Sequence, residues 1–142
     1  MRRPAAAAVA LAALVLGGCG APSADLYVVE RTGSTPGARL SMLVGDGGTV
    51  SCNRGPQRQI TSDQLIEARE IADGLNGDEE EPGPAARGLT LPPAPGSILR
   101  YRVRSEAGVV AFSDTSRGQP EAFYRLARLT RRLAKEACGL AR

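Results

Sequence analysis

Histidine and tryptophan are absent from the sequence, and lysine occurs only once, as Lys135. Without histidine there is no Ser-His or Cys-His nucleophile pair, and the usual zinc sites lose their commonest ligand. A Ser-Lys pair would have to use Lys135, whose neighbours Arg128, Arg131 and Arg132 indicate an exposed helix face. The missing residue types therefore argue against the common catalytic centres.

Paired carboxylates are the catalytic arrangement that the composition still allows, for example Asp114 with Glu106 or Asp46. No pattern places such a pair across a sugar-sized cleft, and Asp114 is better explained as the cap of a loop or turn. The glycine-rich motifs that hold nucleotide phosphates are also missing. We therefore expect a protein that is not an enzyme, with no catalytic residue, no cofactor and no metal site.

Long apolar runs are scarce, and the longest lies at the N-terminus, at 5–16, after Arg2 and Arg3. Twelve apolar residues are too few to span a bilayer, which takes about 20. A positive start, an apolar stretch and small residues at Gly17-Gly18 are typical of a secretory signal peptide. The signal favours general secretion, because the residues that a twin-arginine signal needs around its arginine pair are missing.

The end of this signal, Leu16-Gly17-Gly18-Cys19, resembles the lipobox of bacterial lipoproteins. The resemblance implies that Cys19 receives a diacylglyceryl group, that the peptide is cut before it and that the new N-terminus is acylated, for example with palmitate. Residues 1–18 are then a signal peptide and 19–24 a short lipidated tether. The alternative is an incidental cysteine in a cleaved leader. We expect a protein anchored through membrane lipid at the extracytoplasmic face of the cell membrane.

The charge of the processed chain is close to neutral. Removing Arg2 and Arg3 leaves 16 basic residues in the processed chain. All 15 acidic residues follow Cys19, so the net charge falls to +1. This balance gives no support to a nucleic-acid partner. The excess of arginine over lysine is typical of a GC-rich genome, such as that of an actinobacterium.

Two cysteines, Cys52 and Cys138, remain after Cys19. A domain outside the membrane meets oxidising conditions, so a disulfide between them is expected. Two buried free thiols are the alternative.

Residues 25–142 are expected to form a single domain. Leu40, Met42 and Val44 alternate as in a half-buried strand, and Thr61 with Gln64 has capping-box spacing for a helix that ends at Gly74 or Gly77. The expected strands are 25–31, 39–44, 49–52, 97–104 and 109–113, and the expected helices start at Thr61 and Pro120. The fold class is therefore α+β, a two-layer domain of order β-β-α-β-β-α, with two helices on one face of an antiparallel sheet.

The long connection at 76–96 combines an acidic run with five prolines, and we expect it to be partly mobile. Its acidic run fails the calcium-loop pattern when this starts at Asp73, because Leu75 and Gly77 stand at ligand positions. A solvated charge run explains it better.

Four segments together are similar to emfourin-like domains, a family that includes inhibitors of thermolysin-type metallopeptidases. They are Gly45-Asp46-Gly47-Gly48-Thr49-Val50, Thr61-Ser62-Asp63-Gln64-Leu65, the strand from Pro95 through Tyr101-Arg102-Val103, and Phe112-Ser113-Asp114. The resemblance covers 26–137 and implies no particular inhibitory residue. It makes a secreted metallopeptidase the alternative partner.

Arginine provides the most distinctive surface pattern. Arg100, Arg102 and Arg104 alternate with Leu99, Tyr101 and Val103, so the arginines are predicted on the open face of the sheet. Arginine pairs well with carboxylate or phosphate, although a merely solvated face is the alternative. We expect a noncatalytic envelope lipoprotein whose binding domain meets an envelope protein or another anionic partner, and as the alternative an emfourin-like inhibitor.

Overall fold

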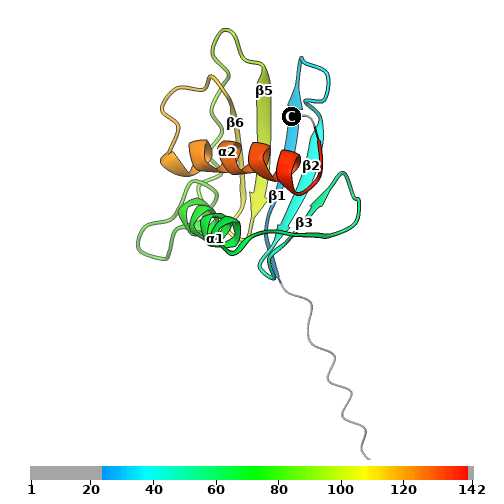
Figure 1. Cartoon of the computed structure of the whole chain (residues 1–142). Helices are drawn as coiled ribbons and strands as arrows, with labels where there is room; N and C mark the ends of the chain where they lie inside the picture. Colours follow the sequence, from blue (N-terminus) through cyan, green and yellow to red (C-terminus); the bar gives the residue numbers. More distant parts are fainter. Residues whose placement is uncertain (1–23, 141–142) are drawn as a thin grey trace, which may run out of the picture.

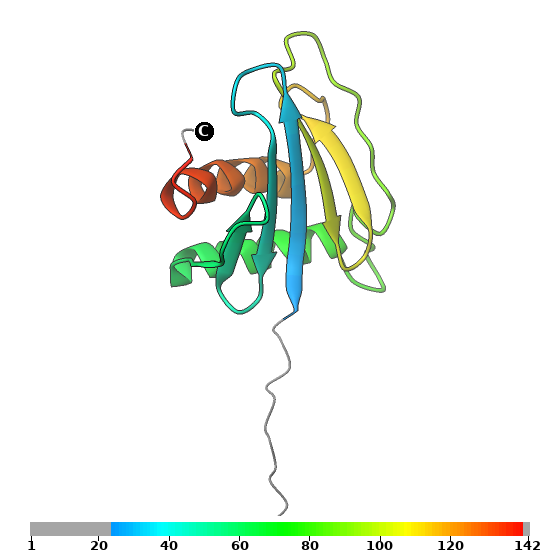
Figure 2. The same cartoon turned by 90° about the vertical axis from the view of Figure 1, so that its right-hand side faces the viewer.

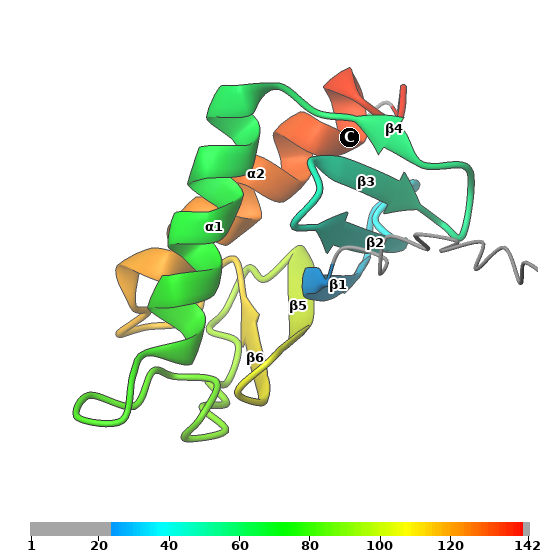
Figure 3. The same ribbon diagram turned by 90° about the horizontal axis from the view of Figure 1, so that it is seen from below.

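The computed structural model describes residues 24–140. Within that range the chain forms an α+β domain, in which one six-stranded antiparallel sheet carries two helices on one face (Figures 1 and 3). The elements are β1 (Asp25–Gly33), β2 (Leu40–Gly45), β3 (Thr49–Cys52), β4 (Arg58–Gln59), α1 (Ser62–Asn76), β5 (Leu99–Ser105), β6 (Val109–Ser113) and α2 (Glu121–Glu136). The strand order is β4-β3-β2-β1-β5-β6, so the predicted fold class is confirmed.

Strand β1 lies at the centre of the sheet and pairs with both β2 and β5. Side chains alternate along it, since successive residues of a strand point to opposite faces. Tyr27, Val29 and Arg31 are buried toward the helices, whereas Glu30 and Thr32 are exposed on the other face. The burial of Arg31, only 2% exposed, was not predicted from the sequence.

The core lies between the sheet and the helices. Helix α1 begins with the predicted capping box, in which the Gln64 amide donates to Thr61 Oγ1 and the Thr61 amide donates to Gln64 Oε1. It ends at Gly77, whose φ of 66° favours glycine. Helix α2 runs across the strands (Figure 1), and its Phe123 stacks on Phe112 at 4.3 Å between ring centroids.

A disulfide joins Cys52 at the end of β3 to Cys138 just after α2, across 86 positions of the sequence. Their Cα atoms lie 6.2 Å apart. The predicted pairing is therefore confirmed, and it ties the C-terminal end of α2 to the sheet.

The predicted order β-β-α-β-β-α undercounts the strands, because four rather than two or three precede α1 in the described part. The missed strand, β4, has only two residues, Arg58 and Gln59, both exposed, and it pairs with Thr49 and Val50 of β3. Such a short polar strand has no hydrophobic periodicity to reveal it. Helix α2 also begins one position later than predicted, with Pro120 as its N-cap.

The connection at 76–96 is held against the domain by backbone hydrogen bonds that its composition did not predict. The Ala85 amide donates to the carbonyl of Leu75, and Ala85 itself is buried. Further along, the Leu91 amide donates to Ala111 of β6, whose own amide donates to Leu89. The segment thus runs along the outer side of β6 (Figure 2).

The signal peptide and the expected lipidation site Cys19 lie outside the described residues. Among residues 24–140, no helix is both long enough and apolar enough to cross a membrane.

Candidate functional site

The face of the sheet opposite the helices carries the predicted arginine row. Arg100, Arg102 and Arg104 of β5 are exposed, while Tyr101 and Val103 between them are buried. In register, Arg100 lies opposite Thr32 of β1, Arg102 opposite Glu30 and Arg104 opposite Val28. The alternation predicted from the sequence is therefore confirmed.

Glu30 lies directly opposite Arg102, but within the described part no ion pair joins them. The Glu30 carboxylate instead accepts a hydrogen bond of 2.7 Å from the Ser41 hydroxyl of β2. None of Arg100, Arg102 and Arg104 makes a hydrogen bond or an ion pair through its side chain with any residue of 24–140. The three guanidinium groups therefore keep their donors available.

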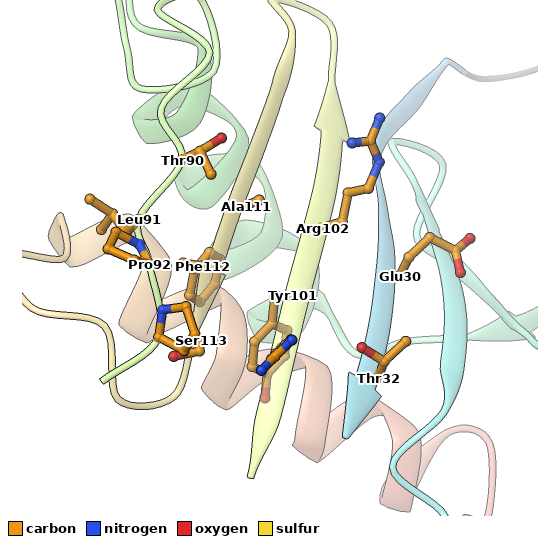
Figure 4. Close-up of a pocket in the computed structure, with 12 residues that line it drawn as sticks. Glu30, Thr32, Thr90, Leu91, Pro92, Tyr101, Arg102, Ala111, Phe112 and Ser113 are labelled. Carbon is orange, nitrogen blue, oxygen red and sulfur yellow. The ribbon is translucent and has the colours of Figure 1, made fainter. Parts of the chain in front are cut away.

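A hollow of about 420 Å³ lies on this face (Figure 4). Arg100 and Arg102 line it from β5 and Glu30 and Thr32 from β1. The opposite wall is apolar and consists of Leu91, Pro92 and Pro93 from the connection beside β6. That connection therefore provides one side of the site.

Two further hollows adjoin the first. One, of about 300 Å³, shares Thr32 and Arg100 with it. The other, of about 320 Å³, shares Glu30 and is lined by Arg39 and Arg54. We call the surface formed by Arg39, Arg54, Arg100, Arg102 and Arg104 around these hollows the basic face. Glu30 is the one carboxylate that lines any of the three hollows among the described residues.

Sequence reasoning missed Arg39 and Arg54. Arg39 was recoverable, because alternation with the buried Leu40 places it on the same face as Ser41. Arg54 was not, since its position depends on the turn after β3, where Asn53 and Arg54 both adopt a left-handed backbone with φ of 53° and 60°. The turn is held by Asn53, whose side-chain Oδ1 accepts from the Ser41 amide at 3.0 Å.

Ion pairs lie on other parts of the described surface. Arg69 contacts Asp46 at 2.6 Å, Arg132 contacts Glu67 at 3.0 Å, and Arg125 bonds Glu70. The hydrogen bond that Arg125 donates to the Glu70 carboxylate raises the pKa of the Arg125 guanidinium. None of these ion pairs involves an arginine of the basic face, where Glu30 is the one carboxylate that lines the described hollows.

The carboxylates considered for catalysis are kept apart. Glu106 lies in the β5–β6 turn and Asp114 directly after β6, so the two occupy opposite ends of that strand. Asp114 accepts the amides of Ile98 and Leu99 at 3.1 Å, which confirms its expected role as a loop cap. Asp46 is engaged by Arg69. This geometry does not assemble a general acid and base.

In the acidic run at 78–81, Asp78 Oδ1 accepts the amides of Glu80 and Glu81, which forms a local turn. Residues 24–140 contain no group of three or more cysteine, aspartate or glutamate side chains placed to hold a metal ion.

The fold and the basic face define an α+β domain whose antiparallel sheet has one open, arginine-lined surface. No protein-family model matches the chain, and no curated protein and no solved structure matches it significantly.

Proposed function

We propose that the processed protein is a noncatalytic lipoprotein, held by lipid on Cys19 at the extracytoplasmic face of the cell membrane, whose basic face binds an acidic protein segment. One observation carries the proposal. Arg39, Arg54, Arg100 and Arg102 line adjoining hollows in which Glu30 is the one described carboxylate, and none of them is neutralised within the described chain. A row of uncommitted guanidinium groups is suited to paired hydrogen bonds with carboxylates.

The wall opposite the arginines favours a protein over a nucleic acid. Leu91, Pro92 and Pro93 offer apolar surface to a side chain of the partner. Glu30, in the middle of the face, would repel a continuous phosphate backbone, and the nearly neutral processed chain lacks the excess charge on which nucleic-acid binding depends. An extended segment with carboxylates and an apolar side chain fits this combination.

With the anchor proposed at Cys19, the direction of β1 would extend the basic face away from the membrane. Strand β1 starts at Asp25, six residues after Cys19, and Thr32 lies about 24 Å further along at roughly 3.4 Å per residue. Since Arg104 pairs with Val28 and Arg100 with Thr32, the row extends outward from the tethered end. A lipid-anchored domain would thus hold its hollows toward the envelope space.

The anchor is tested by replacing Cys19 with serine. Without the thiol no diacylglyceryl group can be attached, so the Cys19→Ser protein should leave the membrane fraction or remain uncut, while circular dichroism of the domain stays unchanged. Wild-type protein should fractionate with the membrane and gain the mass of its acyl chains. A Cys19→Ser protein that is processed and still firmly membrane-bound would rule out the anchor.

The basic face is tested with a triple variant, Arg100→Ser, Arg102→Ser and Arg104→Ser. Arg87, Arg117 and Arg128 provide the matched control, because they are exposed and their replacement by serine removes the same charge elsewhere. We expect the first triple variant to lose a partner captured from envelope extract and the control to retain it, with capture weakening as salt rises. Equal capture by both would leave the row as a solvated face.

The emfourin-like inhibitor is the second proposal, and the loop between β1 and β2 favours it. Pro36 and Gly37 at its tip are exposed. The buried Arg31 donates hydrogen bonds to the carbonyl groups of Gly37 and Ala38, which restrains the loop. A rigid exposed loop is suited to a protease cleft, because little entropy is lost on binding. Stoichiometric inhibition of a thermolysin-type metallopeptidase, lost on shortening this loop, would support it over the first proposal.

A further inference from the structure

A second cavity, of about 380 Å³, lies on the helix side of the sheet. It is bounded by the loop between β1 and β2, by the start of β5 and by α2. Figure 2 shows this loop bending toward the side on which α2 lies. The residues that matter here are Arg31, Ile98, Leu99, Asp114, Arg131 and Lys135, and we call the cavity they line the loop pocket. It lies on the other side of the sheet from Glu30, because Arg31 points to the opposite side of β1, and it shares only Ile98 with the hollows of the basic face.

Three positive charges line the loop pocket. Arg31 is buried, and its Nε–H donates to the Ala38 carbonyl at 2.8 Å and its Nη2 to the Gly37 carbonyl at 3.3 Å. These bonds fix the guanidinium in place. Arg131 and Lys135 are exposed, lie one turn apart on α2, and make no side-chain hydrogen bond or ion pair with any residue of 24–140.

Asp114 is the one carboxylate among the described lining residues, and its oxygens are already in use. Both accept the Ile98 amide, at 3.2 Å and 3.1 Å, while Oδ2 also accepts the Leu99 amide and Oδ1 the Ser97 hydroxyl. No ion pair within 4.0 Å joins Asp114 to a cation in the described part. The pocket therefore retains an excess of positive charge.

The phenol of Tyr101 is affected by the charges of residues that line the loop pocket. Burial raises the pKa of Tyr101, while the positive charges of Arg31 and Arg131 act to lower it and the negative charge of Asp114 acts to raise it. Arg31 comes from the sheet and Arg131 from α2, so their charges reach the same point from two elements.

We propose that the loop pocket binds a small organic anion. Its carboxylate or phosphate group would contact Arg131 and Lys135, with Arg31 at the base of the pocket. A short apolar part of the ligand would contact Ile98 and Leu99. Guanidinium and ammonium groups bind either head group, and the volume lies at the lower end of the range for small-molecule sites. Ile98 is 48% exposed, which is high for an isoleucine and leaves apolar surface for the ligand to cover.

The test titrates the purified processed protein with four probes, benzoate, phenyl phosphate, inorganic phosphate and the uncharged benzamide, and follows binding by calorimetry and by amide shifts at Leu99 and Asp114. We expect saturable binding of benzoate or phenyl phosphate and none of benzamide. Whichever of the two binds tighter identifies the head group. Tight binding of inorganic phosphate alone would show that the apolar contact is wrong.

The variant Arg131→Gln with Lys135→Gln should weaken binding by about tenfold or more, since a hydrogen bond to a charged group contributes about 1.5–3 kcal/mol. Arg117→Gln with Arg128→Gln removes the same charge from exposed positions outside the pocket and should bind as the wild type does. Both pairs avoid the buried Arg31, so the fold is expected to survive. Equal weakening in both variants, or no saturable binding of any probe at millimolar concentration, would overturn the proposal.

Discussion

The disulfide should contribute a large part of the stability of this domain. Breaking it frees a loop of 86 positions in the unfolded chain, for which loop-closure entropy is about 15 cal/mol/K, or about 4.6 kcal/mol at 25 °C. Both cysteines are only partly buried, so replacing them with alanine removes little packing. With an unfolding entropy of about 2.1 cal/mol/K per residue, the melting temperature should fall by roughly 15–20 °C.

The assay is urea unfolding followed by circular dichroism, comparing the wild type with the variant Cys52→Ala and Cys138→Ala. Wild-type protein that is reduced and alkylated serves as the control for the substitutions. Both disulfide-free forms should unfold at lower urea with similar midpoints. A variant within about 1 kcal/mol of the oxidised protein would refute the reasoning, because the unfolded chain would then gain little freedom when the link is absent.

Three further predictions concern single side chains. Val103→Ala should lower the free energy of unfolding measured in urea by about 2–4 kcal/mol, because Val103 is fully buried. Arg102→Ala should lower it by less than about 0.5 kcal/mol. Equal losses would mean that the face of the sheet that carries Arg102 is covered. Ser105→Ala should leave thermal stability unchanged or higher, because Ser105 Oγ is buried and has no hydrogen-bond partner in the described part; a loss above about 1 kcal/mol would contradict this. Burial raises the pKa of Tyr27 above its usual value of 10.0. The stability that its neutral phenol contributes is therefore present below pH 10 and is lost above it, because the unfolded chain ionises first. The variant Tyr27→Phe should reduce the fall in melting temperature at alkaline pH.

The parts of the fold that could be predicted are those with strong local patterns. Alternation identified β2 and β5, the turn sequence at 105–108 indicated that β6 follows in a hairpin, and the spacing of Thr61 and Gln64 located the start of α1. These features depend on residues close in sequence, so a single chain contains the information.

The parts that could not be predicted depend on tertiary contacts. Strand β4 exists because its two residues pair with β3, and the connection beside β6 is held by hydrogen bonds to Ala111. Arg31 belongs to the helix-facing set of β1, a position at which a charged residue is uncommon. Its partners, the carbonyl groups of Gly37 and Ala38, come from the next loop, so the loop pocket had no signal in the sequence.

The two edges of the sheet bear on how the protein would behave at the high local concentration that the proposed lipid anchor would produce. An exposed strand edge presents free amide and carbonyl groups and invites another copy to pair with it, and tethered copies would meet often. One edge of this sheet is the two-residue β4, which is too short to pair stably with a strand of another copy. The other edge, β6, is covered where the chain at 89–91 forms hydrogen bonds with Ala111. We therefore expect the proline-rich connection to limit pairing between copies, in addition to lining one hollow of the basic face. Replacing Leu91 with proline would remove its amide donor and expose that edge, so self-association is the property that this substitution should change first.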